Sequence, residues 1–299
     1  MKNWSKKKKI SIIVSGIIIL LLMYPLYVFM RVRGVVDEAY TPLETEDIRE
    51  EEIELGADPF STLVMGIDRD SPTDVGRSDT MMLITVNPRL GTTYILSIAR
   101  DTMVTINGRQ TRINHAYAYG GPELSINTVQ ELLNVPIDRY VEISMDSFAT
   151  LVDAVGGITV YNDTVAFTRF GHHFSMGYNE LNGENVLAFV TMRKEDPEGD
   201  YGRQARQRIV MAELMNTMVG SALTNHMAIL NAAGDGLKTD ISFGDVTTIA
   251  LNYAGALGRI ENLYLRGRTQ MINGMSLEVM DQSDIDEVSE TLRNHLELD

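Results

Sequence analysis

Apolar residues along this chain form short continuous runs that alternate with segments of helical spacing. Buried strands are predicted at 61–68, 80–87, 92–99, 140–145 and 158–162. Helices are predicted at 121–134, 146–157, 203–223, 227–233, 243–257 and 281–298. Strands that alternate with helices indicate an α/β fold, with a sheet covered by helices on both faces.

Local signals place several element boundaries. Pro122 fits the first turn of a helix, and Asp146 is a candidate N-cap for the next one. Asp281 or Ser283 caps the last helix. The Asn273–Gly274 pair predicts the turn of a hairpin within 261–280.

An uncharged stretch near the amino terminus, Ile10 to Met30, has 21 residues. That length spans the roughly 30 Å hydrocarbon core of a membrane. The lysines at 6–9, just before this stretch, predict that residues 1–9 lie in the cytoplasm and that the chain after the stretch lies outside the cell. A cleaved signal peptide is the alternative, but the stretch is long for one and no A-x-A-like site follows. We therefore expect a single-pass anchor in the cell membrane at 10–30, a stalk at 31–57 and an extracellular domain at 58–299.

Charge and composition narrow the function classes. Residues 1–33 hold seven Lys or Arg and no Asp or Glu, which leaves 19 basic against 41 acidic residues in the remainder. A remainder this acidic argues against a nucleic-acid partner, which requires a basic surface. The chain has no cysteine, which excludes disulfides, thiolate nucleophiles and cysteine–zinc sites.

Two carboxylates lie where predicted strands end and begin. Asp68 ends the first strand, and Arg77 and Asp79 precede the second. If the two strands are neighbours, the carboxylates approach each other and form hard oxygen ligands, which suit Mg²⁺ or Mn²⁺ beside a phosphate. Local Asx-turn chemistry is the alternative interpretation.

Arg100 and Asp101 directly follow the third predicted strand. Ligands of open α/β sheets bind beyond the carboxyl ends of strands, so this pair is a candidate for a binding site. A surface ion pair of small energetic value is the alternative.

The stretch "MRKEDPEGDYGRQARQR" at 192–208 carries a second group of arginines. We expect Arg193 to end one helix and Asp200 to cap the next, so that Arg203 and Gln207 share a face four residues apart, with Arg206 near it. Guanidinium forks beside a helix N-terminus predict a polyphosphate site. The alternative is salt bridging with acidic residues of the intervening turn, Glu195, Asp196 and Glu198.

The histidines indicate no metal site. His115 and the pair His172–His173 are expected in loops, without metal-ligand spacing. No nucleophile-elbow or P-loop pattern is present. Any chemistry is therefore expected from the arginines and carboxylates.

Several long motifs in one order carry a family resemblance. They are "GRSDTMMLITVNP", "SIARDT", "RINHAYAYGGPELSINTVQELL", "YVEISMDSFATLVDAVGGITV", "LNGENVLAFV" and "RKEDPEGDYGRQARQ". Between about Ser61 and Ile209 the chain resembles the LytR–CpsA–Psr family, whose members also have one amino-terminal membrane anchor.

The resemblance implies both a fold and an activity. The fold is an α/β/α sandwich with a central mixed β-sheet and a long apolar groove for a lipid. The activity is transfer of a phospho-glycan, such as a teichoic acid or capsular polysaccharide, from a polyprenyl-pyrophosphate carrier to a peptidoglycan hydroxyl in Gram-positive cell-wall assembly. Some of the seventeen methionines could line the groove, although ordinary core packing explains them as well.

The resemblance also implies residue roles. Residues matched to pyrophosphate binding are Arg77, Arg100, Arg193, Arg203 and Gln207. Asp68 and Asp79 match the positions associated with Mg²⁺. Arg100, Asp101 and Asp79 are the expected catalytic residues, and Asp101 is the candidate to orient or deprotonate the acceptor hydroxyl.

Two positions depart from the family pattern. Ala99 stands where the family often has proline, and Thr191 stands where it usually has arginine. The second departure removes one phosphate-binding cation. A non-catalytic binding protein for polyprenyl phosphates that regulates envelope assembly, and a hydrolase of the pyrophosphate, therefore remain alternatives.

Overall fold

The computed structural model describes residues 33–43, 53–69, 74–221 and 236–298, with single positions at 23, 27, 30, 31, 45, 48, 49, 228, 229 and 232. Most of the predicted anchor at 10–30 and of the predicted helix at 227–233 lies outside the described residues. Within them, no helix has the length and apolar character needed to cross a membrane.

A six-stranded sheet forms the centre of the domain, in the order β11–β6–β1–β2–β3–β12. Its strands are β1 (Phe60–Asp68), β2 (Arg77–Asn87), β3 (Thr92–Ile98), β6 (Arg139–Ser144), β11 (Leu237–Thr239) and β12 (Ile260–Leu263). β1 runs parallel to β6 and antiparallel to β2, and β3 runs parallel to β12. The predicted mixed sheet is thus confirmed, as are its strands at 61–68, 80–87, 92–99 and 140–145.

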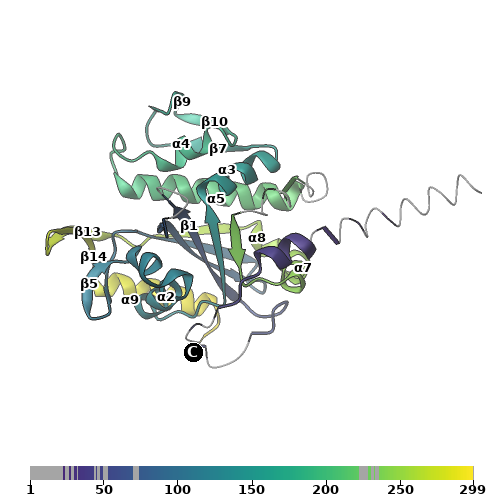
Figure 1. Ribbon diagram of the computed structural model, residues 1–299, viewed down its shortest axis with the longest axis horizontal. Helices are drawn as coiled ribbons and strands as arrows, with labels where there is room; N and C mark the ends of the chain where they lie inside the picture. The colour runs from purple at the N-terminus through teal and green to yellow at the C-terminus, as the bar shows by residue number, and fades with distance from the viewer. Residues whose placement is uncertain are drawn as a thin grey trace, which may run out of the picture.

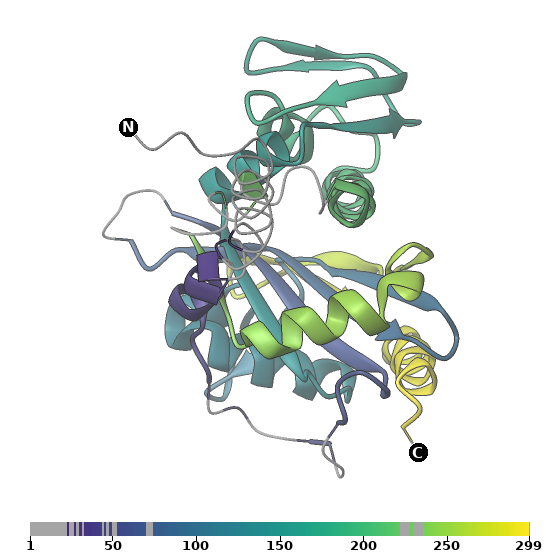
Figure 2. The same ribbon diagram turned by 90° about the vertical axis from the view of Figure 1, so that its right-hand side faces the viewer.

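Both faces of the sheet are covered by helices (Figures 1 and 2). Side chains alternate along β1: Leu63 and Met65 join the core under α2 (His115–Leu133) and α9 (Gln282–His295), whereas Val64 joins the opposite core. The opposite core also contains residues of α5 (Asp200–Ser221), α7 (Phe243–Asn252) and α8 (Ala254–Leu257). The α/β/α layering follows from strands that are apolar on both faces.

A third hydrophobic core lies above α5 (Figure 1). Its elements are α3 (Met145–Ala154), β7 (Ile158–Asn162), β8 (Phe167–Arg169), β9 (His172–Phe174), β10 (Gly177–Leu181) and α4 (Val186–Thr191). The rings of Phe167, Phe174 and Phe189 contact one another at its centre. In both ribbon views α5 lies between this upper module and the sheet.

The predicted strand at 158–162 is confirmed as β7, but the strands after it were not predicted. β8 and β9 have three residues each, too few to show an alternating pattern. His172 and His173 therefore lie in β9 and not in a loop. His173 Nδ1 is 3.0 Å from the Thr168 hydroxyl across this hairpin.

Two hairpins have the same turn chemistry. Asn273–Gly274 joins β13 (Gly267–Ile272) to β14 (Met275–Met280), as predicted, with both turn residues at positive φ. Asn107–Gly108, also at positive φ, joins β4 (Met103–Ile106) to β5 (Arg109–Arg112), a hairpin that was not predicted. The short strands of the second hairpin hid a turn signal as strong as the first.

Helix starts differ from the predictions in three helices, and α5 begins at Asp200 itself, which was expected to cap it. α2 begins at His115, which was expected in a loop, and is kinked at Gly120–Gly121 just before Pro122. The N-cap of α3 is Ser144, whose side chain accepts a hydrogen bond from the Ser147 amide, and not Asp146. For α9 the predicted cap position Asp281 is confirmed, although its side chain makes no capping hydrogen bond.

The helix predicted at 243–257 is broken at Tyr253 into α7 and α8. Tyr253 is fully buried, packs edge-on against Phe60 with 5.0 Å between the ring centroids, and donates a hydrogen bond to the Asp58 carbonyl at 2.6 Å. Its hydroxyl also accepts from the Gly56 amide at 2.9 Å. These contacts with residues distant in sequence fix the break, so no local pattern could reveal it.

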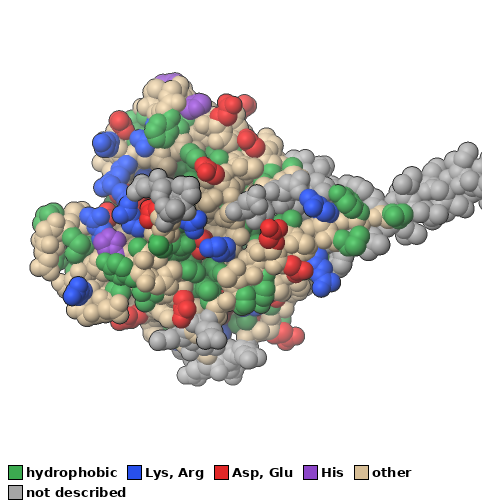
Figure 3. All heavy atoms as spheres, viewed as in Figure 1, with side chains coloured by type: hydrophobic (Ala, Val, Ile, Leu, Met, Phe, Trp, Pro, Cys, Tyr) green, Lys and Arg blue, Asp and Glu red, His purple; other side chains and the backbone are tan. Residues whose placement is uncertain are grey.

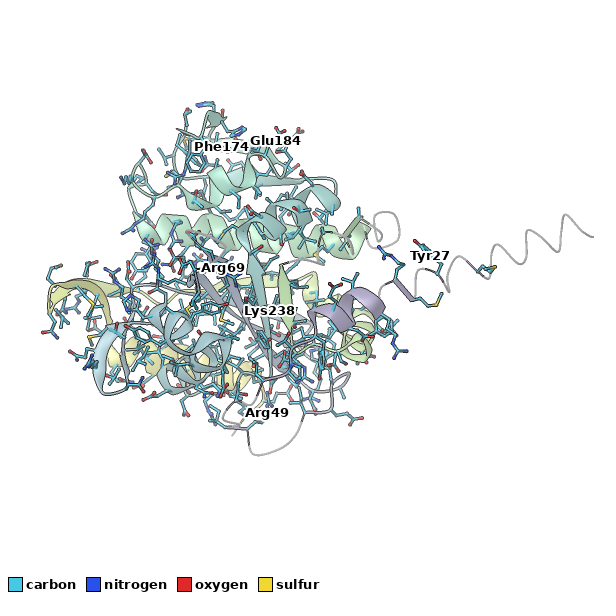
Figure 4. All side chains as sticks on the ribbon, in the orientation of Figure 1. Tyr27, Arg49, Arg69, Phe174, Glu184 and Lys238 are labelled. Atoms are coloured by element: carbon cyan, nitrogen blue, oxygen red, sulfur yellow. The ribbon has the colours of Figure 1, made fainter. Side chains whose placement is uncertain are left out.

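The described part of the predicted stalk contacts the domain. The Thr41 amide donates to the Thr239 carbonyl at 2.7 Å, and the Tyr140 hydroxyl donates to the Thr41 carbonyl at 2.7 Å. Farther along, Arg49 pairs with Asp138 through two hydrogen bonds of 2.8 and 2.9 Å. Arg49 lies at the end of the molecule opposite Phe174 and Glu184 of the upper module (Figure 4).

Candidate active site

A cavity of about 500 Å³ lies between the sheet and the upper module. It meets the carboxyl ends of β1 and β6, the start of β2, and residues of α3, α4, α5 and β8. Lys and Arg side chains gather on the surface between the upper and lower parts of the molecule (Figure 3). This is the sheet edge at which α/β proteins bind ligands.

One part of the cavity wall is apolar. The apolar lining residues are Val64, Met82, Ile143, Met145, Phe148, Phe170, Leu187, Val190 and Met211. Three of them are methionines, as expected for a site that adapts to an irregular apolar ligand. Nearby polar groups make this an amphipathic cavity, apolar in one region and charged in another.

Six of the eight predicted site residues line this cavity. They are Asp68, Asp79, Arg100, Arg193, Arg203 and Gln207. These residues come from segments up to 139 positions apart in the sequence, and the fold brings them to one place. The two groups of arginines expected from the sequence are thus parts of one site.

Arg77 and Asp101 do not line the cavity. Arg77 is exposed at the start of β2, opposite Asp68 in the strand pairing. Asp101 lies 3.2 Å from Arg112 and 4.0 Å from Arg100, measured between guanidinium nitrogen and carboxylate oxygen. Asp101 is therefore placed to orient Arg100, and its predicted direct role at the acceptor hydroxyl stays a prediction.

Asp79 connects the sheet to the arginines of the site. One carboxylate oxygen pairs with Arg100, and the other accepts a hydrogen bond from Asn114 Nδ2 at 2.8 Å. Its backbone carbonyl accepts from Arg203 Nη1 at 3.1 Å. Next to it, Gln207 Nε2 donates to the Thr80 hydroxyl at 3.0 Å, so the first turns of α5 are fastened to β2.

The charge on Arg100 is stabilised by its neighbours. Burial lowers the pKa of the guanidinium, but the charges of Asp79, Asp101 and Asp200 and the hydrogen bond to Asp79 outweigh it and raise that pKa above its ordinary value. Arg100 therefore remains a cation at the cavity wall. A fixed cation that is partly shielded from water interacts more strongly with a bound phosphate than an exposed one does.

Asp200 holds the arginines on either side of the turn at 194–199. Its two oxygens accept from Arg203 Nε and Nη2 at 2.9 and 3.1 Å, and Arg193 Nε lies 3.4 Å away. Burial raises the pKa of Asp200, but hydrogen bonds from Arg203 and Gln204 and the charges of both arginines hold it below its ordinary value. Asp200 is thus ionised at neutral pH and positions two phosphate-binding candidates.

Arg206 has a structural role, as the salt-bridge alternative implied for this stretch. It pairs with Asp196, donates to the carbonyls of Phe189 at 3.1 Å and Met192 at 2.5 Å, and is almost fully buried. Gly202 permits this arrangement, since a Cβ there would lie 2.1 Å from an Asp196 oxygen. The predicted helix end at Arg193 is also corrected, because α4 ends at Thr191 and Arg193 follows it in the turn.

Two further cations at the cavity were not among the predicted site residues. Arg169 at the end of β8 and Lys194 in the turn both line it. Lys194 stands between matched motif residues and Arg169 lies in a three-residue strand, so neither had a pattern to mark it. The turn that follows Arg169 is marked in the sequence only by Gly171, and both Phe170 and Gly171 have positive φ there.

Comparison with known protein families identifies the family to which this chain belongs. The model of the LytR_cpsA_psr family matches residues 26–294. The chain belongs to this family. Within the family, the polyisoprenyl-teichoic acid–peptidoglycan teichoic acid transferase TagU of Enterococcus faecalis is 40% identical, with 98% of this chain and 99% of that protein covered. TagU of Bacillus subtilis is 37% identical, with 99% and 100% covered.

A solved structure of TagT bound to LI-WTA is similar in fold. It is 27% identical, with a TM-score of 0.73 over 87% of this chain and 99% of that one. The mixed sheet with its helical layers is therefore the fold of this family, as the motifs implied.

Proposed function

We propose that this protein transfers a teichoic-acid-type glycopolymer from a polyprenyl-pyrophosphate carrier to a hydroxyl of peptidoglycan. The observation that carries the proposal is the cavity, which joins an apolar wall to a group of arginines, Arg100, Arg193 and Arg203. Such a cavity matches a ligand that is itself a long hydrocarbon ending in two phosphates. Relatives at 35–40% identity over nearly the whole chain carry the name of a teichoic acid transferase.

The reaction is a phosphoryl transfer in which positioning and charge neutralisation dominate. The acceptor oxygen bonds to the glycan-side phosphorus as its hydroxyl gives up its proton, for which Asp101 is the candidate acceptor. The bond to the bridging oxygen breaks, and prenyl phosphate leaves. Arg100, Arg193 and Arg203 neutralise the non-bridging oxygens, and Gln207 supplies a neutral amide at the same wall. The apolar wall holds the prenyl chain.

We propose that Asp68 and Asp79 hold a divalent cation, Mg²⁺ or Mn²⁺, together with the donor phosphates. Both carboxylates line the cavity, and Mg²⁺ commonly takes only one or two carboxylates plus phosphate oxygens. Asn114, which hydrogen-bonds to Asp79, also has a buried side-chain oxygen without a hydrogen-bond partner in the described structure. This all-oxygen set fits the ion, although the described residues contain no group of three acidic or histidine ligands. When bound, the ion adds positive charge at the phosphates.

The transfer itself is the first test of this function. The full chain in detergent, with a polyprenyl-pyrophosphate-linked teichoic acid, peptidoglycan fragments and Mg²⁺, is expected to give glycan covalently attached to the fragments, detected by mass spectrometry. Chelation with EDTA is expected to lower the rate, and added Mg²⁺ to restore it. Bound donor without product would instead support a non-catalytic binding protein. Free phospho-glycan released without acceptor would support a hydrolase.

We also propose that 10–30 anchors the protein in the cell membrane, with the amino terminus in the cytoplasm and the domain outside. The proposal is supported by the uncharged stretch and by the five lysines that precede it, which outweigh Arg31 and Arg33 on its far side. Protease added to intact cells with the wall removed is expected to digest the domain at 58–299. A domain that stays protected until the membrane is lysed would contradict this orientation.

A further inference from the structure

Arg169 reaches the cavity from the side of the upper module. It is the last residue of β8, and it lines the cavity together with Arg100, Arg193 and Arg203. The first of those arginines follows β3, and the other two lie in or before α5. Arg169 therefore approaches the cavity on a different element from the three cations already described.

A hydrogen bond to Thr191 orients the guanidinium of Arg169. Its Nε donates to the Thr191 hydroxyl at 3.0 Å, and that hydroxyl donates to the Leu187 carbonyl at 2.6 Å. Thr191 is the last residue of α4 and also lines the cavity. Since Nε is engaged with Thr191, the two terminal nitrogens of Arg169 remain available to a ligand.

No carboxylate pairs with Arg169 among the residues that the structure describes. Arg100, Arg193 and Arg203 each have an aspartate within 3.5 Å, so part of their charge is balanced. The Arg169 guanidinium instead lies over the ring of Phe170, 4.5 Å from its centroid. A half-buried cation that is balanced by no acidic group in its surroundings is suited to an anionic ligand.

The turn beyond Arg169 has an unusual backbone. Phe170 has a φ of 50° and is 70% exposed, and Gly171 follows with a φ of 83°. Two successive positive φ values are typical of two-residue hairpin turns, whose backbone twist matches that of the flanking strands. An aromatic residue in the first of these positions is strained. Strain of this kind is often found at binding sites, and both Phe170 and Arg169 line the cavity.

We propose that Arg169 is a further phosphate-binding residue for the donor and that Thr191 is its positioning residue. Thr191 stands where the family pattern has arginine, so the cation missing from α4 is supplied here by β8 through the Arg169–Thr191 hydrogen bond. This inference rests on the proposed function, because it takes the ligand to be a prenyl pyrophosphate. The guanidinium binds the pyrophosphate from the upper module, whereas the other arginines bind it from the sheet edge and from α5.

Calorimetric binding of a C15 prenyl pyrophosphate to the full chain in detergent tests the proposal, with C15 prenol as the uncharged comparison. Arg169→Gln is expected to raise the Kd for the pyrophosphate about ten- to a hundredfold, as for loss of a charge-assisted hydrogen-bonding group, and to leave prenol binding unchanged. Thr191→Val, which keeps the shape but removes the hydroxyl, is expected to raise it about three- to tenfold, and Thr191→Ser to restore it.

A second-site variant separates charge from architecture. In Arg169→Gln/Thr191→Arg the cation returns on α4, and pyrophosphate affinity is expected to recover to within a few-fold of the wild type. Arg259→Gln is the matched control, because it removes the same charge from a side chain that is 68% exposed and outside the cavity lining. Its affinity is expected to equal that of the wild type.

Three results would overturn the proposal. Wild-type affinity in Arg169→Gln would show that the residue does not bind the phosphates. An equal loss of pyrophosphate and prenol binding would show that it only shapes the cavity. If the wild type itself fails to bind the pyrophosphate, the proposed function fails together with this inference, whereas the first two results leave that function intact.

Discussion

Replacing Arg100 or Arg203 with alanine is expected to lower the rate of glycopolymer transfer by about 10²- to 10³-fold, the loss typical of removing one preorganised group that stabilises transition-state charge. Both guanidinium groups line the cavity and contact Asp79. Arg100 pairs with the Asp79 carboxylate, and Arg203 donates to the Asp79 backbone carbonyl. Their charge is therefore fixed before the donor binds. The measurement is the initial rate of product formation with a polyprenyl-pyrophosphate donor at saturating acceptor.

Lysine at the same positions distinguishes charge from geometry. Arg100→Lys and Arg203→Lys keep a cation but lose the planar fork that binds two oxygens at once, so an intermediate loss of rate is expected. Arg268→Ala is the control, since this side chain is 75% exposed on a hairpin and, among the described residues, forms an ion pair with Asp281 alone. Equal rates in wild type, Arg100→Ala and Arg203→Ala, with folded protein in every case, would refute the assignment of the site.

Replacing Arg206 with alanine is expected to lower the free energy of unfolding by about 3–5 kcal/mol, because it leaves the buried carboxylate of Asp196 without its partner. The two side chains are 3% and 0% exposed. Arg206 also holds the carbonyls of Phe189 and Met192, and so ties the end of α4 to α5. Urea unfolding followed by circular dichroism measures the loss.

Arg268→Ala again provides the comparison. Its ion pair with Asp281 is exposed, with side-chain fractions of 75% and 52%, and its loss is expected to cost less than about 1 kcal/mol. A loss of similar size in the two variants would contradict the structural role of Arg206. Because Arg206 does not line the cavity, the Arg206→Ala variant that remains folded at low temperature should still bind the prenyl pyrophosphate.

Most residues of the candidate site were predictable from motifs, whereas Arg169, which adds a further cation to it, was not. Asp68, Asp79 and Arg100 were marked by their positions at the ends of apolar strands, and α/β sheets gather such positions at one edge. Arg169 had no such mark, because β8 is three residues long and its place beside Thr191 depends on how the upper module packs on α5. Arg203 and Arg206 show the same limit: they are three positions apart on one helix, yet one lines the cavity and the other is sealed beneath the turn.

The sequence by itself determined the α/β class, four of the six strands of the central sheet and the family, because these depend on local periodicity and on motifs within continuous segments. The uncharged stretch at 10–30 predicts an anchor in the same way. Tertiary structure alone decided which cations face the cavity, where the 243–257 helix breaks at Tyr253, and which residue supplies the cation absent at Thr191. Those outcomes depend on contacts between residues far apart in the chain, such as Tyr253 with Gly56 and Asp58, whose free energy no single segment encodes.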